Sequence, residues 1–111
     1  MEPKLTADFR VKALIRRVQQ VGAIAMVVHR GDATAGSVLV KHNRFAAGCR
    51  VLSQTRDPAG ALAWFAATGT ATVDEAAADA YIERQLRFDR DLWVIEVEDP
   101  RGTWSPDEAM V

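Results

Sequence analysis

Apolar and polar positions follow two different periods along the chain. Over residues 8–21 (DFRVKALIRRVQQV) apolar side chains recur three and four positions apart, which predicts an amphipathic helix that ends at Gly22. A second helix is predicted over 73–88, where Thr72 and Glu75 have the spacing of a capping box. Four short runs rich in β-branched residues predict strands, at residues 23–30, 37–43, 49–56 and 93–99.

Three further segments complete the pattern: a loop, a possible fifth strand and the C-terminal tail. The loop GDATAG after residue 30 carries two glycines and predicts a hairpin between the first two strands. The segment 61–68 (ALAWFAAT) has an aromatic centre that favours a strand and alanines that favour a helix; we interpret it as a strand. Residues 100–111 contain two prolines and no periodicity, which predicts a loose tail from which Trp104 folds back onto the domain.

These elements predict a single α+β domain over residues 1–111, with an ordered core over 8–99 and a tail over 100–111. Its parts are an N-terminal helix, a mostly antiparallel sheet of four to five strands, and a second helix before the last strand. Each helix has a single apolar stripe, so we expect both helices to cover one face of the sheet.

The composition is that of a soluble globular domain: 49% of the 111 residues are apolar and 26% are charged. Cys49 is the single cysteine, so no disulfide forms within the chain, and a reducing compartment is favoured. The first twelve residues lack the apolar stretch of a signal peptide, and no apolar run reaches the length of a membrane span. The sequence therefore predicts a cytoplasmic protein with no membrane contact.

Charge is divided unevenly between the two halves of the chain. Residues 1–56 contain ten Lys and Arg against three Asp and Glu, whereas residues 57–111 contain four against twelve. In a domain this short we expect the halves to interleave and neutralise each other.

The polar side of the first predicted helix is basic, with Arg10, Arg16 and Arg17 as its arginines. Such a face can attract an acidic protein surface or a nucleic-acid backbone, or it can simply be solvated. No aromatic residue lies between the cations to stack on bases, so nucleic acid is the less favoured partner.

An acidic stretch runs through residues 87–99 (RFDRDLWVIEVED). Glu96 and Glu98 lie two apart on a predicted strand, so their carboxyl groups share a face about 7 Å apart, as any such pair would. Asp89 and Asp91 fall where the second helix gives way to the strand, and short acidic side chains often bond to turn backbone there. The pattern favours turn capping and a solvated face over acid–base chemistry.

The remaining chemistry-bearing residues do not form a motif. His29, His42 and Cys49 would have to converge to hold a metal, yet the predicted hairpin keeps the two histidines about 13 Å apart. No nucleophile elbow, glycine-rich phosphate loop or paired-cysteine motif occurs in the chain. We therefore expect no cofactor and no metal.

Three blocks of the sequence, FRVKALIRR, GAIAMVVHRGDATAGSVLVK and RQLRFDRDLWVIEVED, resemble the bacterial domain-of-unknown-function family 1491. The resemblance covers residues 8–99. Arg90 stands where the family pattern has a proline. The resemblance implies a small bacterial α+β protein, and it brings no catalytic residue with it.

Three functional hypotheses follow, in order of preference. The first is a non-enzymatic interaction or adaptor module that binds a protein partner or itself, with Arg10, Arg16 and Arg17 as one patch and Asp89 and Asp91 as an opposing one. The second is a small hydrolase, with or without a divalent ion, that uses Asp89, Asp91 and one of the two strand glutamates. The third is a weak nucleic-acid binder that uses the basic helix.

Overall fold

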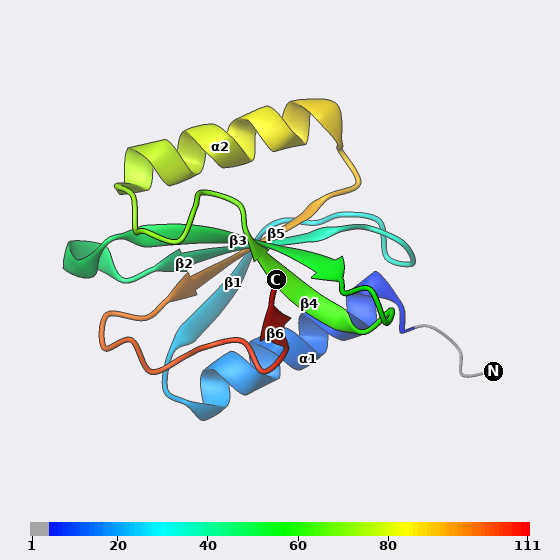
Figure 1. The fold of residues 1–111 in the computed structure, drawn as a ribbon, viewed down its shortest axis with the longest axis horizontal. Coiled ribbons are helices and arrows are strands. Elements are labelled where there is room, and N and C mark those ends of the chain that lie inside the picture. The colour runs from blue at the N-terminus through cyan, green and yellow to red at the C-terminus, as the bar shows by residue number, and fades with distance from the viewer. Residues whose placement is uncertain (1–4) are drawn as a thin grey trace.

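A mixed six-stranded sheet lies between two helices in the computed structural model, which describes residues 5–111 (Figure 1). The first four residues of the expected domain lie outside the described part. The elements in chain order are α1 (Ala7–Gln20), β1 (Ile24–His29), β2 (Val38–Asn43), the short 3-10 helix η1 (Phe45–Ala47), β3 (Cys49–Arg56), β4 (Leu62–Ala66), α2 (Glu75–Phe88), β5 (Trp93–Glu98) and β6 (Ala109–Met110). Within residues 5–111, no helix has the length and apolar character needed to cross a membrane.

The strand order is β1-β5-β2-β3-β4-β6, so β5 lies between β1 and β2. The predicted hairpin between the first two strands is therefore wrong. All six residues of β2 are buried, and so are four of the six residues of β5, whereas no residue of β1 is buried. A strand that is apolar on both faces belongs in the middle of a sheet covered on both sides, and this preference places β5 beside β2.

Two strand pairs are parallel, β2 with β5 and β4 with β6, and the other three are antiparallel. The expectation of a mostly antiparallel sheet with four to five strands is thus only roughly right. The interpretation of residues 61–68 as a strand is confirmed, because Leu62–Ala66 forms β4.

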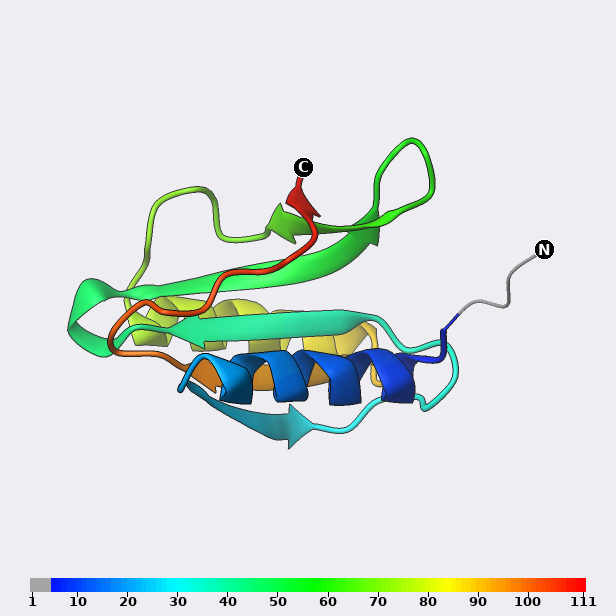
Figure 2. The ribbon, with the colours of Figure 1, turned by 90° about the horizontal axis from the view of Figure 1, so that it is seen from below.

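The two helices cover opposite faces of the sheet (Figures 1 and 2). Val38 and Val40 pack in one cluster with α1, whereas Leu39 between them packs in the cluster that holds Ala78 and Ile82 of α2. Successive side chains of a strand point to opposite faces, so a fully apolar strand needs a cover on each side. The prediction that both helices lie on one face is wrong for this reason.

The second helix begins later than its predicted capping box. Val73 still exchanges backbone hydrogen bonds with Cys49 as an isolated bridge, so the chain is extended up to that point. Asp74 is the N-cap, and its carboxylate accepts a hydrogen bond from the backbone N–H of Ala77 at 2.8 Å. Thr72 instead lies against Gly48, where a Cβ atom would come within 2.7 Å of it.

The segment after residue 99 folds back across the sheet instead of forming the loose tail predicted. Trp104 is only 5% exposed, as its expected return to the domain requires. Beyond it, Asp107 forms an ion pair with Arg17 of α1, and β6 pairs with β4. Figure 2 shows this segment, in orange and red, running along the sheet.

Candidate functional site

The parallel register of β2 and β5 brings a histidine and an aspartate together at the ends of these strands. His42 lies beside Val97, and Asp99 follows the last residue of β5. The Nε2 atom of His42 lies 2.8 Å from a carboxylate oxygen of Asp99. The two residues are 4% and 1% exposed, so the pair is buried.

Asp99 organises the loop that follows it. One carboxylate oxygen accepts hydrogen bonds from the backbone N–H and the hydroxyl of Thr103, at 2.9 and 3.1 Å. The other accepts the backbone N–H of Trp104 at 3.0 Å. Burial alone would raise the pKa of Asp99, but the hydrogen bonds from His42, Trp104 and Thr103 lower it to about 2. Asp99 is therefore ionised at neutral pH.

His42 is held as a neutral ring with one free nitrogen. Burial lowers its pKa; the hydrogen bond and charge of Asp99 oppose that effect, and the charges of Arg50 and Arg44 add to it. Because the Asp99 carboxylate can only accept, Nε2 carries the proton and Nδ1 has the lone pair. Within residues 5–111, the buried Nδ1 has no hydrogen-bond partner. Trp104 packs edge-on against the ring, with 5.0 Å between ring centres.

A cavity of about 290 Å³ opens beside this ring. Its walls come from β2, β3, the segment before α2 and the folded-back C-terminal loop: His42, Arg44, Arg50, Thr70, Thr72, Gly102 and Trp104. Gly102 has a positive φ of 65°, and a Cβ atom there would lie 2.4 Å from a guanidinium nitrogen of Arg44. The glycine thus leaves the space in which the Arg44 guanidinium packs.

A second polar cluster joins β2 to α2. The ammonium group of Lys41 lies 2.7 Å from carboxylate oxygens of both Glu75 and Asp79, and 3.5 Å from Glu96. Burial alone would lower the pKa of Lys41, but the hydrogen bonds that it donates to Asp79 and Glu75 and the nearby charge of Glu96 raise it. Glu96 therefore faces α2, and its contacts are those of an ion-pair network that fixes the helix to the sheet.

The free thiol of Cys49 lies in the same neighbourhood, buried and 3.3 Å from the side-chain oxygen of Asn43. Burial raises the pKa of this thiol. A buried, protonated thiol behaves as a small core side chain.

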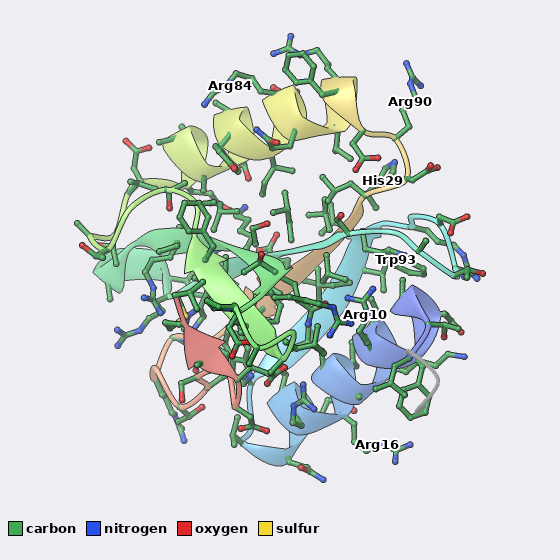
Figure 3. The ribbon with its side chains drawn as sticks, turned by 45° about the vertical axis from the view of Figure 1, so that its right-hand side comes forward. Arg10, Arg16, His29, Arg84, Arg90 and Trp93 are labelled. Carbon is green, nitrogen blue, oxygen red and sulfur yellow. The ribbon has the colours of Figure 1, made fainter. Side chains whose placement is uncertain are left out.

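The arginines of the predicted basic patch have different surroundings. Arg10 turns toward the sheet, where its guanidinium donates to the side chain of Gln54 and to the carbonyl oxygen of Gly36 (Figure 3). Arg17 forms ion pairs with Asp107 and Glu108 at 3.2 and 3.4 Å. Arg16 is exposed and lies on a shallow groove of α1 together with Phe9, Ala13 and Gln20. The three arginines therefore share a helix but not a single free surface.

The predicted acidic residues lie in the turn between α2 and β5. The carboxylate of Asp89 accepts the backbone N–H of Asp91 at 3.0 Å, and the carbonyl oxygen of Asp91 accepts the backbone N–H of Asp32 at 2.9 Å. Asp91 and Glu96 are five residues apart along extended chain, a span of roughly 16 Å. The structure therefore does not bring these carboxylates to one site.

The two histidines lie on opposite sides of β5. The ring of His29 is 2.7 Å from the carbonyl oxygen of Leu92, and His42 is bonded to Asp99. In the described part of the chain, no three His, Cys, Asp or Glu side chains gather closely enough to hold a metal ion.

A free sheet edge is the other distinctive surface feature. β1 pairs with β5 on one side, and no strand of residues 5–111 covers its other side. Its apolar side chains are exposed on both faces, with Ile24 at 57%, Met26 at 42%, Val27 at 46% and Val28 at 58%. No charged residue and no proline occurs within Ile24–His29.

These features define the class of this protein. It is a small α+β protein with one helix on each face of a mixed sheet and a C-terminal segment anchored by a buried His–Asp pair. The chain belongs to the DUF1491 family, described as a protein of unknown function, whose model matches residues 5–105. A comparison with curated proteins found no match.

Solved structures of relatives have the same fold. The crystal structure of a DUF1491 family protein from Caulobacter crescentus CB15 is 38% identical, covers 97% of this chain and 100% of its own, and superimposes with a TM-score of 0.85. A solution structure of a DUF1491 family protein from the same organism is 39% identical over 99% of each chain, with a TM-score of 0.81. A protein from A. tumefaciens is 29% identical over 91% of this chain and 92% of its own, with a TM-score of 0.75.

Sequence reasoning missed both the His42–Asp99 pair and the β1 edge. The pair depends on β2 running parallel to β5, which a predicted hairpin excludes. The edge was not found because the predicted hairpin pairs β1 with β2 and leaves the strand order open, so it does not say which strand lies at an edge. A usable signal existed in the unbroken apolar runs Val38–Val40 and Trp93–Ile95, which are typical of central strands.

Proposed function

We propose that this chain is a non-enzymatic interaction module that self-associates through the free edge of β1. The observation that carries the proposal is an uncovered edge strand with apolar side chains exposed on both faces of the sheet. Pairing this edge with its own copy joins two six-stranded sheets into one.

Natural sheets protect their edges with short strands, lysines, prolines or bulges. The opposite edge follows this rule, since β6 contains only two residues. β1 contains six residues without charge or proline, and its single irregularity lies at the far end, between Val27 and His29. An edge of this kind offers backbone donors and acceptors to a partner strand.

A second copy of the chain is the partner that fits this edge best. Antiparallel pairing of a strand with itself satisfies two-fold symmetry, because each contact is made twice. Uncharged residues then meet uncharged residues, so no like charges lie opposite each other. With Met26 on the two-fold axis, Met26 meets its counterpart on the α2 side of the joined sheet, and Ala25 lies opposite Val27 of the second copy on the α1 side.

The basic face of α1 supplies a second surface of the proposed module. Arg16 remains exposed beside Phe9, whereas Arg10 and Arg17 are engaged within the chain. Arg16 is therefore the arginine of the predicted set best placed to meet an acidic partner. Asp89 and Asp91 remain the proposed opposing patch, although one of them already caps a turn.

The acidic hydrolase and the nucleic-acid binder receive less support. Glu96 belongs to the ion-pair network of Lys41, and Asp89 caps a turn. Two of the three arginines that a nucleic-acid backbone would need are bonded within the chain.

Replacing Met26 by lysine tests the proposed self-association. In the register of the sheet, residue 26 pairs with Glu96, so the new ammonium group gains a cross-strand carboxylate and the monomer keeps its fold. Two such lysines near the symmetry axis repel each other, so the dissociation constant of the dimer should rise at least about tenfold. Light scattering after size-exclusion chromatography measures the mass.

Phe65→Lys is the matched control, since it places the same charge at a 52% exposed aromatic of β4, far from β1 in strand order. We expect this variant to remain dimeric. A wild-type chain that stays monomeric at high concentration, or a Met26→Lys variant as dimeric as the wild type, would contradict the proposal.

A further inference from the structure

We propose that the cavity beside His42 binds a phosphate group, free or as a small phosphate monoester. This site is independent of the β1 edge and would operate in a monomer or a dimer. The supporting observations are the charge of its walls, the buried and unpartnered Nδ1 atom of the lining residue His42, and its size.

Two guanidinium groups give the cavity its charge. Among residues 5–111, no carboxylate lies within ion-pair distance of Arg44 or Arg50. The Nε–H of Arg44 is buried and has no acceptor in the described part of the protein. Buried donors are almost always satisfied in native proteins, and a planar guanidinium matches the oxygens of a phosphate or a carboxylate.

The histidine narrows the choice between these anions. Asp99 holds the proton of His42 on Nε2, so Nδ1 can only accept a hydrogen bond. The His42 side chain is only 4% exposed. A ligand that satisfies Nδ1 presents a donor as well as negative oxygens. An ionised carboxylate has no donor, whereas phosphate and its monoesters carry an O–H near their second pKa of about 6.

The hydroxyl groups and the size of the cavity agree with this ligand. Thr70 and Thr72 line the same space and can donate to the remaining phosphate oxygens. A volume of about 290 Å³ is at the lower end of small-molecule sites. It accommodates a phosphate with a short organic remainder.

Titration with inorganic phosphate at a pH of about 6.5, followed by NMR of the His42 ring and the Arg44 Nε–H, tests the proposal. Phosphate should move both sets of resonances in a saturable manner. Sulfate, which has no proton to donate at this pH, should bind at least about tenfold more weakly. A parallel titration with glycerol 3-phosphate distinguishes a monoester site, in which it binds more tightly, from a site for free phosphate.

Arg50→Gln should weaken phosphate binding about tenfold or more, since it removes a charge-assisted pair of hydrogen bonds. Arg50→Lys keeps the charge and the fold but not the fork of donors, and it should bind with intermediate affinity. Arg16→Gln removes an exposed arginine elsewhere and should bind as the wild type does.

Three results would overturn the proposal. These are no shift at His42 with either phosphate probe, sulfate binding as tightly as phosphate, or equal weakening by Arg50→Gln and Arg16→Gln. The last two would indicate unspecific attraction of anions by the protein surface.

Discussion

Replacing Asp99 by asparagine should lower the free energy of unfolding by roughly 3 kcal/mol, because hydrogen bonds to a charged acceptor contribute about 1.5–3 kcal/mol each and a buried donor left without an acceptor costs about 1–3 kcal/mol. The carboxylate accepts four hydrogen bonds, from His42, from Trp104 and twice from Thr103. An asparagine amide can accept on one atom only, so its NH₂ group would face a donor that the aspartate satisfied. Urea unfolding at neutral pH measures the loss.

Asp107→Asn is the matched control for this experiment. Asp107 lies in the same C-terminal segment, but its side chain is 71% exposed and its ion pair is with Arg17 at the surface. The expected change is at most about 1 kcal/mol, the usual size for an exposed pair. Equal losses in the two variants would show that the Asp99 hydrogen bonds do not hold the segment.

The same pair gives the wild type a defined response to acid. His42 has a folded-state pKa below its ordinary value of 6.5, so the unfolded chain binds more protons and stability falls as the pH drops below about 6.5. Asp99 has its pKa lowered from 3.8 to about 2, so a further loss of roughly 2 kcal/mol falls between those values. This second loss should vanish in the Asp99→Asn variant, which urea unfolding over a pH series can measure.

Local pattern was enough to find most of the elements. The spacing of Val11, Leu14 and Val18 predicted α1, and these three residues are buried as expected. The exact ends of the elements, and which elements lie side by side, were harder to predict from local pattern. Thr72 has the right spacing for a cap, but a backbone bridge at Val73 keeps the chain extended and leaves the cap to Asp74.

Strand order could not be derived from adjacent segments, because it depends on which strands must be covered on both faces. Val38, Leu39 and Val40 are all buried, and so each face beside β2 needs a helix. That requirement places α1 and α2 on opposite faces of the sheet. It also allows β5, which is apolar on both faces for most of its length, to lie beside β2. The His42 site follows only from this parallel register, since 57 positions separate His42 from Asp99 in the sequence.

Replacing Trp93 by alanine should lower the free energy of unfolding by about 3–5 kcal/mol, the range for removing a buried tryptophan. Trp93 is 2% exposed at the start of β5 and packs in the core on the α1 face. Its indole N–H donates to the carbonyl oxygen of Asp32 at 2.8 Å, and Arg30 lies 5.5 Å from the ring centre. The ring thus joins the core to the loop between β1 and β2 (Figure 3).

Trp93→Phe separates packing from the hydrogen bond. It keeps an aromatic ring in the core but leaves the Asp32 carbonyl without the indole donor, so we expect a loss of about 1–2 kcal/mol. The backbone N–H of Asp32, which donates to Asp91 at 2.9 Å, should exchange faster with solvent in this variant. Phe88→Ala, at an 87% exposed aromatic, is the control and should change stability by less than about 0.5 kcal/mol. If Trp93→Phe leaves both the stability and the exchange of Asp32 unchanged, the loop does not depend on the indole hydrogen bond, and the core packing alone holds it.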